Sequence, residues 1–373
     1  MVALRRAAER VLPAVVLGVL PLALAALVLA GTLQHHFWDF RVFWHAGHDV
    51  IAGHSPYPPP NATNLAHENS FVYPPETALA FVPLALLPYH VVAPLFLIAL
   101  FGTVLLTLRV LGVRDWRCYG AAFLMAPVIG SITNGAISSL LALLLAVAWR
   151  YRDSWKTVGA AVAGAVVAKV FLWPLLVWLV ATRRYAAAGA TIAGGALITA
   201  TSWAVLGFAG LRDYVHLLRI LAQVEQAKGF SPIALGLSLG LSAGWAHAVA
   251  LILGAGALFM IFVLARRPAG DRLSLAAAVG AALLLSPIVW LHYFVILLVP
   301  LAISRPRFTV LWVLLPLPFW FVSSSSGQSG GHATLIVLAL VAAAAMLVVG
   351  TRPTTSARRV ALRRSPVTAT GSQ

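Results

Sequence analysis

Long apolar segments separated by short polar clusters run along most of the chain. An apolar segment of about 20 residues is long enough to cross the hydrocarbon core of a bilayer as a helix. The pattern therefore predicts an all-α, polytopic membrane protein with about 12 membrane segments, some of them short broken helices. The expected segments are 11–33, 90–108, 119–133, 137–149, 157–182 (counted twice), 186–208, 245–265, 273–289, 293–303, 308–322 and 334–350.

The stretch 157–182 is counted twice because of the charges at its two ends. Basic clusters lie at 150–156 and at 183–184. If both clusters are cytoplasmic, the stretch must cross as two half-spans that turn near Lys169. Short, broken pairs of this kind often line internal sites of membrane proteins. A single helix that crosses once is the alternative, and it would put the two clusters on opposite sides.

The basic residues set the expected orientation of the chain. The formal net charge is +16, yet only 10% of the residues are charged and 61% are hydrophobic. Cytoplasmic loops carry an excess of lysine and arginine, so we place the clusters in the cytoplasm and expect no nucleic acid partner. With this orientation, all but five of the 26 lysines and arginines lie on the cytoplasmic side. All 11 histidines lie on the outer side. The five exceptions are Arg41, Lys169, Arg212, Arg219 and Lys228. Candidate chemistry is therefore expected on the extracytoplasmic side.

The sequence lacks the residues that several classes of chemistry need. The single cysteine, Cys118, rules out a disulfide framework and a cysteine-rich metal site. No glycine-rich phosphate loop leads into a lysine, and the pair His67 and Glu68 lacks the second histidine of a zinc-protease motif. Nucleotide-driven and zinc-hydrolase chemistry are therefore not expected, and we predict no metal site and no resident cofactor.

One transmembrane domain, 1–350, is expected, with two extracytoplasmic parts. These are the first outer loop, 34–75, and an amphipathic segment at 211–230. The polar tail 351–373 carries several arginines and few apolar residues, a composition that predicts disorder on the cytoplasmic side.

The first outer loop contains an amphipathic pattern. Phe40, Phe43, Trp44 and Gly47 recur with helical spacing. We expect a helix in the membrane interface, with its aromatic face toward lipid. Asp39 stands where this helix begins, so its carboxylate could cap the helix or take part in chemistry.

Four motifs follow one another along the expected outer side. They are Asp39 with the helix and turn that end in Gly53, Pro56, Tyr57 and then Tyr73-Pro74-Pro75; Asn134-Gly135; Lys169 with Pro174; and the run Ser286, Pro287, Ile288, Val289, Trp290, Leu291, His292, Tyr293. In this order they resemble glycosyltransferase family 87, over roughly residues 35–300. Ala136 stands where that family usually has a glutamine, which puts the contact of that side chain in doubt.

The resemblance implies a fold and a reaction. The family comprises bacterial polyprenyl-phosphate-sugar-dependent mannosyl- and arabinosyltransferases with the C-type membrane fold. By resemblance, this chain moves a sugar, with mannose favoured, from a polyprenyl-phosphate donor to a hydroxyl of a lipid-linked glycan or glycolipid, and the configuration inverts. The expected place is the extracytoplasmic face of the bacterial plasma membrane.

Two alternatives stay open. An arabinofuranosyltransferase that uses decaprenyl-phosphate-arabinose fits the same family. A lipid or sugar transporter, from another class, also explains half-spans and a lysine at membrane depth. A transporter is expected to show two related halves, and the sequence shows none.

The resemblance also implies the roles of individual residues. Asp39 corresponds to the catalytic base that takes the acceptor proton. Lys169 is expected to bind the departing phosphate, because a cation at membrane depth is costly unless it is used. His292 is expected to form a hydrogen bond to the phosphate or to the sugar. Snorkelling of Lys169 to the interface and a place for His292 in an aromatic belt are the structural alternatives. The expected donor-binding set also includes Asn134, Arg41, Tyr57 and Trp290.

Overall fold

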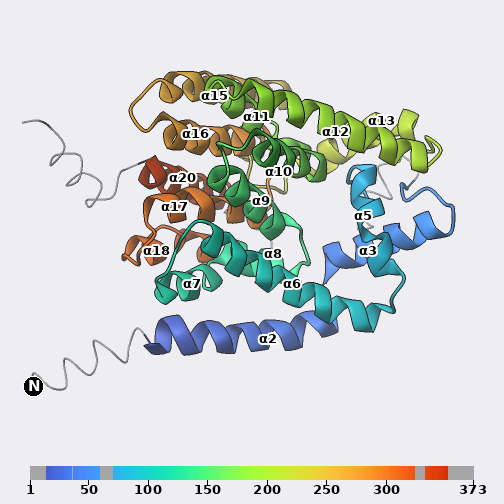
Figure 1. Cartoon of the computed structure of the whole chain (residues 1–373), viewed down its shortest axis with the longest axis horizontal. Helices are drawn as coiled ribbons and strands as arrows, with labels where there is room; N and C mark the ends of the chain where they lie inside the picture. Colours follow the sequence, from blue (N-terminus) through green and yellow to red (C-terminus); the bar gives the residue numbers. More distant parts are fainter. Residues whose placement is uncertain (1–13, 36, 59–69, 324–331, 352–373) are drawn as a thin grey trace, which may run out of the picture.

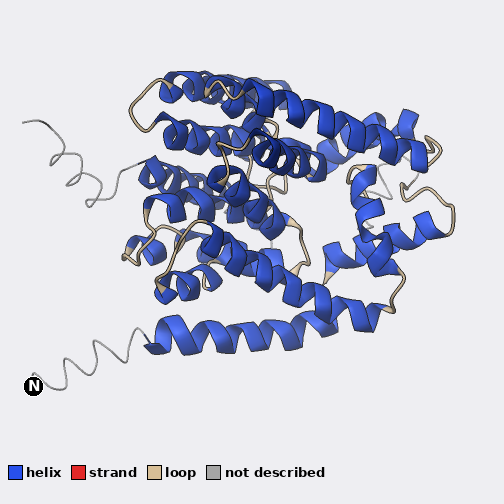
Figure 2. Cartoon of the chain, in the orientation of Figure 1, coloured by secondary structure: helices blue, strands red, loops and turns tan. Residues whose placement is uncertain are grey.

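The computed structural model describes residues 14–35, 37–58, 70–323 and 332–351. Within these ranges the chain is helical and has no β-strand (Figure 2). The N-terminal arginines, residues 59–69 of the first outer loop, most of the loop after 323 and the predicted tail lie outside the described residues (Figure 1).

The described elements follow one another in chain order. The first half contains η1 (Val15–Val19), α2 (Leu20–His35), α3 (Trp38–Ile51), α5 (Pro75–Ala85), α6 (Tyr89–Val110), α7 (Trp116–Phe123), α8 (Ala126–Thr133), α9 (Ser138–Arg150), α10 (Trp155–Ala168), η2 (Val170–Leu172) and α11 (Pro174–Ala181). The second half contains α12 (Tyr185–Val205), α13 (Leu211–Glu225), α14 (Pro232–Ser238), α15 (Ala243–Ala265), α16 (Gly270–Leu285), η3 (Leu291–Leu297), α17 (Leu298–Ser304), α18 (Leu311–Leu314), α19 (Pro318–Ser323) and α20 (His332–Thr351).

Four of the described helices, α6, α12, α15 and α20, are long and apolar enough to cross a bilayer. The pair α8 and α9 makes a fifth candidate, with a bend of 120° between the two helices. These helices confirm the prediction of an all-α integral membrane protein. Shorter apolar helices occupy 155–168, 170–181, 291–304 and 311–322. The count of about 12 segments stays a prediction.

The helix break predicted near Lys169 is confirmed. Helix α10 ends at Ala168, and Lys169 itself is extended, with φ −149° and ψ 107°. The chain then makes the short 3₁₀ turn η2 before α11 begins at Pro174. Because proline has no N–H to donate, it is well suited to the first turn of a helix, where no intrahelical acceptor is available.

The prediction of one continuous segment over 119–133 is wrong. Helix α7 ends at Phe123, and α8 starts only at Ala126, after an extended Met125. Pro127 supplies the reason, because a proline inside a longer helix would remove a backbone hydrogen bond and clash with the preceding turn. The chain therefore breaks before Pro127 and begins a new helix there.

The predicted helix of the first outer loop is confirmed as α3, but the prediction that its aromatic face points to lipid is wrong. Phe40 and Phe43 are fully buried and pack against Phe81 of α5. A side chain at Gly47 would place its Cβ 2.8 Å from the Cβ of Ala85. Periodicity identifies the buried face of a helix, but it does not show whether lipid or a neighbouring helix covers that face.

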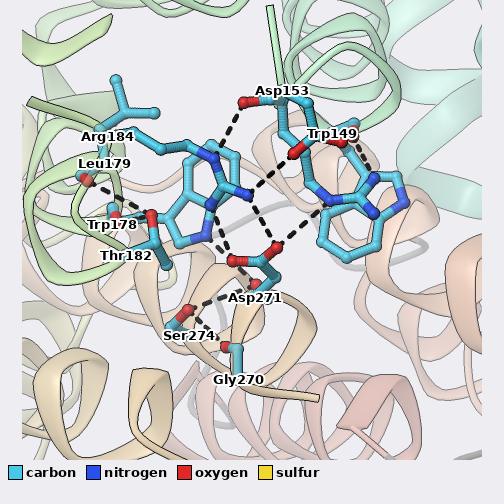
Figure 3. A network of polar contacts seen from close by, with 10 residues as sticks. Trp149, Asp153, Trp178, Leu179, Thr182, Arg184, Gly270, Asp271 and Ser274 are labelled. Carbon is cyan, nitrogen blue, oxygen red and sulfur yellow. Dashed lines mark hydrogen bonds and ion pairs between the residues drawn. The ribbon is translucent and has the colours of Figure 1, made fainter. Parts of the chain in front are cut away.

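A polar network joins three connections at one end of the bundle (Figure 3). Asp271, at the start of α16, accepts hydrogen bonds from Arg184 at 2.7 and 2.8 Å and from Arg152 at 3.3 Å. The clusters on both sides of 157–182 therefore lie at the same end. The stretch between them leaves this end and returns to it, as the half-span interpretation requires. Figure 1 shows α3 and α5 at the opposite end of the molecule.

Candidate functional site

A cavity of about 730 Å³ lies at the end of the bundle that carries α3. Segments that are distant in sequence form its walls: the start of α3, the chain before α5, the break after α10, helix α13 and the extended chain before η3. Its lining includes Trp38, Asp39, Val42, Tyr73, Pro74, Asn134, Lys169, Val170, Phe171, Tyr214, Leu218, Leu221, Glu225, Lys228, Phe230, Ser286, Pro287, Trp290, His292 and Tyr293.

Asp39 lies in the first turn of α3 and presents its carboxylate to the cavity. Its backbone N–H donates to the carbonyl of Asn134 at 2.8 Å. The helix begins after Phe37, and no side chain forms a capping hydrogen bond there, so Asp39 does not act as the cap. One carboxylate oxygen, Oδ2, is buried without a hydrogen-bond partner. Burial raises the pKa of this carboxyl to about 6, and the positive charge of Lys169 opposes the rise.

Lys169 is held in the cavity by the break between α10 and η2. Its side chain is only 5% exposed. Its ammonium group lies 3.9 Å from the centre of the Tyr293 ring and 5.1 Å from that of Tyr73, and it has no hydrogen-bond partner. Two aromatic faces partly offset the cost of burying the cation, while its N–H donors are left unpaired. A snorkelling lysine would reach water instead.

His292 enters the same cavity from η3. It is 7% exposed, and its Nε2 atom is buried without a partner. The extended chain before it is pinned by two contacts. The N–H of Phe230 donates to the carbonyl of Val289 at 2.7 Å, and the Ser231 hydroxyl donates to the carbonyl of Pro287 at 3.0 Å. This extended segment also places Trp290 in the lining.

Asn134 lies at the bend between α8 and α9. Gly135 follows with φ +69°, and a side chain there would meet the Cβ atom of Phe40 and the ring of Phe37. Because only glycine fits this conformation without strain, Asn134-Gly135 forms a close junction with α3. Ala136 is fully buried and lies outside the cavity lining.

Two of the expected donor-binding residues do not line the cavity. Arg41 is exposed on α3, with its guanidinium 5.6 Å from the centre of the Tyr89 ring. Tyr57 donates its hydroxyl to the carbonyl of Tyr73 at 3.1 Å and stacks on Trp203. It therefore supports the wall of the cavity from behind.

Sequence reasoning missed the two tyrosines that flank Lys169. Tyr73 and Tyr293 both belong to the four motifs described above, but no sequence pattern indicates that their rings contact the same lysine. It also missed Glu225 and Lys228, an ion pair at 2.9 Å that lines the cavity after α13.

The unpaired groups define what the cavity can do. A carboxylate with a pKa near neutrality can accept a proton, and an unpaired ammonium beside an imidazole can bind an anion. Among the residues that the structure describes, no three histidine, cysteine, aspartate or glutamate side chains gather around a possible metal ion.

A bundle of apolar helices around such a cavity defines an integral membrane protein with a buried polar site. Residues 71–287 match glycosyltransferase family 87. This match covers more than half of the chain, and the chain belongs to this family.

Two relatives, from Mycobacterium tuberculosis and Mycolicibacterium smegmatis, are each 30% identical to the chain over 250 residues. Both are named polyprenol-phosphate-mannose-dependent alpha-(1-2)-phosphatidylinositol pentamannoside mannosyltransferases. The aligned regions cover 62% and 60% of this chain, and 57% and 58% of the relatives, so the chain matches little more than half of their length. No solved structure matches the chain.

Proposed function

We propose that this protein is an inverting glycosyltransferase that moves mannose from a polyprenyl-phosphate donor to a hydroxyl of a lipid-linked glycan or glycolipid. Membership of family 87 supports the class of enzyme. The names of the two mycobacterial relatives favour mannose over arabinofuranose and a glycolipid as acceptor. The observation that carries the proposal is the meeting of three unpaired buried groups, from Asp39, Lys169 and His292, around one cavity.

Each of these groups has its own role in the proposed reaction. The acceptor hydroxyl oxygen attacks the anomeric carbon of the donor sugar, while the bond from that carbon to the phosphate oxygen breaks. Asp39 takes the hydroxyl proton as the new bond forms. The polyprenyl phosphate leaves with the bonding electron pair, and Lys169 and His292 stabilise its negative charge. Asn134 and Trp290 line the space left for the sugar.

The proposed architecture is a C-type fold of about 12 membrane segments, in a single domain over 1–350, with extracytoplasmic parts at 34–75 and 211–230 and a cytoplasmic tail at 351–373. The proposed location is the bacterial plasma membrane, with the cavity facing outward. The network of Arg152, Arg184 and Asp271 supports this orientation, because it lies at the end of the bundle opposite α3, and basic residues concentrate on the cytoplasmic side.

A direct test compares donors. Purified protein in lipid vesicles receives radiolabelled polyprenyl-phosphate-mannose or decaprenyl-phosphate-arabinose, together with glycolipid extracted from mycobacterial membranes. We expect labelled glycolipid from the mannose donor alone, with inverted configuration. Label from the arabinose donor alone would identify an arabinofuranosyltransferase, and no transfer from either donor would contradict the proposal.

A further inference from the structure

A second cavity, of about 410 Å³, lies between α10 and α12. Its lining is mostly apolar: Glu76, Thr199 and Tyr214 are polar, and the hydroxyl of Thr191 is bonded to backbone carbonyls. It shares the lining residues Pro74, Val170 and Tyr214 with the larger cavity, so the two cavities are adjacent. We call the second cavity the α10–α12 groove.

Small residues of α12 face α10 along the groove. Near one end the two helices touch: a Cβ at Gly159 would lie 2.8 Å from the Cβ of Ala190, and the Thr191 hydroxyl donates to the carbonyl of Gly159 at 3.2 Å. Further along, a Cβ at Gly195 would be in ordinary contact with Val167, at 3.6 Å. Gly195 lines the groove and has no side chain that would project into it.

The groove follows α12 from Thr191 to Trp203. At a rise of 1.5 Å per residue, this distance is about 18 Å. It is more than half of the roughly 30 Å thickness of a bilayer core. The groove is therefore long enough to hold an extended apolar chain.

The groove is also open to the side. Ile192 lines it and is 59% exposed. This residue belongs to α12, which is long and apolar enough to cross a bilayer, so its exposed surface is available to the hydrocarbon of the membrane. A lipid chain can enter the groove from the bilayer without crossing the protein.

The end of the groove at the large cavity is fixed by a polar contact. The Thr199 hydroxyl donates to Glu76 Oε1 at 3.1 Å, which ties α5 to α12. Val170, where the two cavities meet, directly follows Lys169 in the chain. A path of apolar surface thus begins beside the buried cation.

We propose that the α10–α12 groove binds the first isoprene units of the donor's polyprenyl chain, with the phosphate at Lys169. This inference rests on the proposed function. A polyprenyl phosphate carries its anion directly on its apolar chain, so the two must bind side by side, as Lys169 and the groove do. In a glycolipid acceptor, by contrast, the glycan separates the reacting hydroxyl from the acyl chains, which need not lie next to Lys169.

The test fills the groove and varies the donor chain. In Gly195→Leu the new side chain occupies the groove, whereas Gly189→Leu, on the same helix, is a matched control because nothing lies within 4 Å of a Cβ there. For Gly195→Leu we expect the KM of decaprenyl-phosphate-mannose to rise by about tenfold or more, since several buried methylene contacts are lost. The KM of methyl-phosphate-mannose, a donor without any isoprene unit, should stay near the wild-type value, which also shows that the variant is folded. Equal effects on both donors, or no effect on either, would overturn the proposal.

A binding measurement separates this proposal from the proposed function. A polyprenyl phosphate with a photoreactive group on its first isoprene units is activated on the wild-type protein, and the labelled peptides are identified. We expect label in 163–170 and 192–203, and its loss in Gly195→Leu but not in Gly189→Leu. Label confined to other helices would overturn the groove, whether or not the protein transfers sugar. Label in the groove without any transfer would support the groove and contradict the proposed function alone.

Discussion

The ammonium group of Lys169 lies 3.9 Å from the centre of the Tyr293 ring, although the two residues are far apart in the chain. Phe171 stacks on that ring, with centroids 4.9 Å apart. The ring is therefore held in place by its own packing, and it orients a lysine that has no hydrogen-bond partner. A cation positioned by aromatic faces keeps its N–H donors for a ligand.

Removal of the charge at position 169 should abolish transfer. In Lys169→Met the side chain keeps its apolar stem and loses its cation, so donor affinity should fall by at least about tenfold, as expected for the loss of a charged hydrogen bond. Lys169→Arg retains the charge and should keep part of the transfer activity and part of the donor affinity. Donor binding to the two purified variants measures the difference, and normal transfer by folded Lys169→Met would argue for a purely structural lysine.

Tyr293 should act through its ring face. Tyr293→Phe keeps the face beneath the ammonium group and should change donor affinity little. Tyr293→Leu removes it at a cost of about 1 kcal/mol, which corresponds to roughly a fivefold weaker donor affinity. Titration of both variants with labelled donor checks this order. Equal affinities would mean that the ring serves only to fill space.

The sequence predicts some parts of this arrangement for clear reasons. The break at Lys169 follows from two basic clusters that must share one side of the membrane, and the network around Asp271 does bring them together. Helix α3 follows from its periodicity. Periodicity does not predict what packs on Phe40 and Phe43, because an apolar face can pack on lipid or on α5.

The candidate site was only partly predictable for a related reason. Asp39, Lys169 and His292 are charged or titratable groups in apolar surroundings, and such residues are unusual enough to attract attention. Tyr73 and Tyr293 are ordinary aromatic residues near the ends of helices, where tyrosine is common. Only the folded chain shows that they enclose one lysine.

The two ends of the bundle should lie on opposite sides of the membrane. His54 follows α3, and Pro268 lies in the α15–α16 connection, close in sequence to Asp271; both are exposed. In intact cells, an impermeant thiol reagent should label His54→Cys but not Pro268→Cys. The native Cys118 is fully buried and gives no background. Labelling of Pro268→Cys from outside would reverse the proposed orientation.

The Asp271 network should stabilise the fold without affecting chemistry. Hydrogen bonds from Arg184 hold the pKa of Asp271 below its usual range, so its contribution to stability is present above that range and is lost as the pH falls through the lowered pKa. Asp271→Asn should cost about 1–3 kcal/mol, at the lower end because the carboxylate is partly exposed.

The control for this variant is Asp153→Asn. Asp153 contacts Arg184 at 3.4 Å, but its side chain is 82% exposed, and such surface pairs contribute little to stability. Thermal unfolding in detergent should therefore separate the two variants, while transfer at low temperature should stay close to wild type in both. A large loss of activity in Asp271→Asn that still folds would assign the network another role.

Asp39 decides the proposed mechanism. Its carboxyl has a pKa raised to about 6 by burial, and a general base acts only when it is deprotonated. The kcat/KM for transfer should therefore be constant above that pH and fall by about tenfold per pH unit below it. The pH dependence of kcat/KM reports the pKa values of the free enzyme. The decrease caused by protonation of Asp39 should therefore be measured at low donor concentration.

Asp39→Asn separates the catalytic from the structural role of this residue. The amide has nearly the same size as the carboxylate, and position 39 forms no capping hydrogen bond that could be lost, so the variant should fold and bind donor. Without a base, transfer should fall by roughly 10²–10⁴-fold, and the acid limb of the pH profile should disappear. The matched control is Asp49→Asn, on the same helix but outside the cavity lining, which should transfer normally. Near-normal transfer by Asp39→Asn, with the acid limb intact, would assign the proton to a different group and remove Asp39 from the reaction.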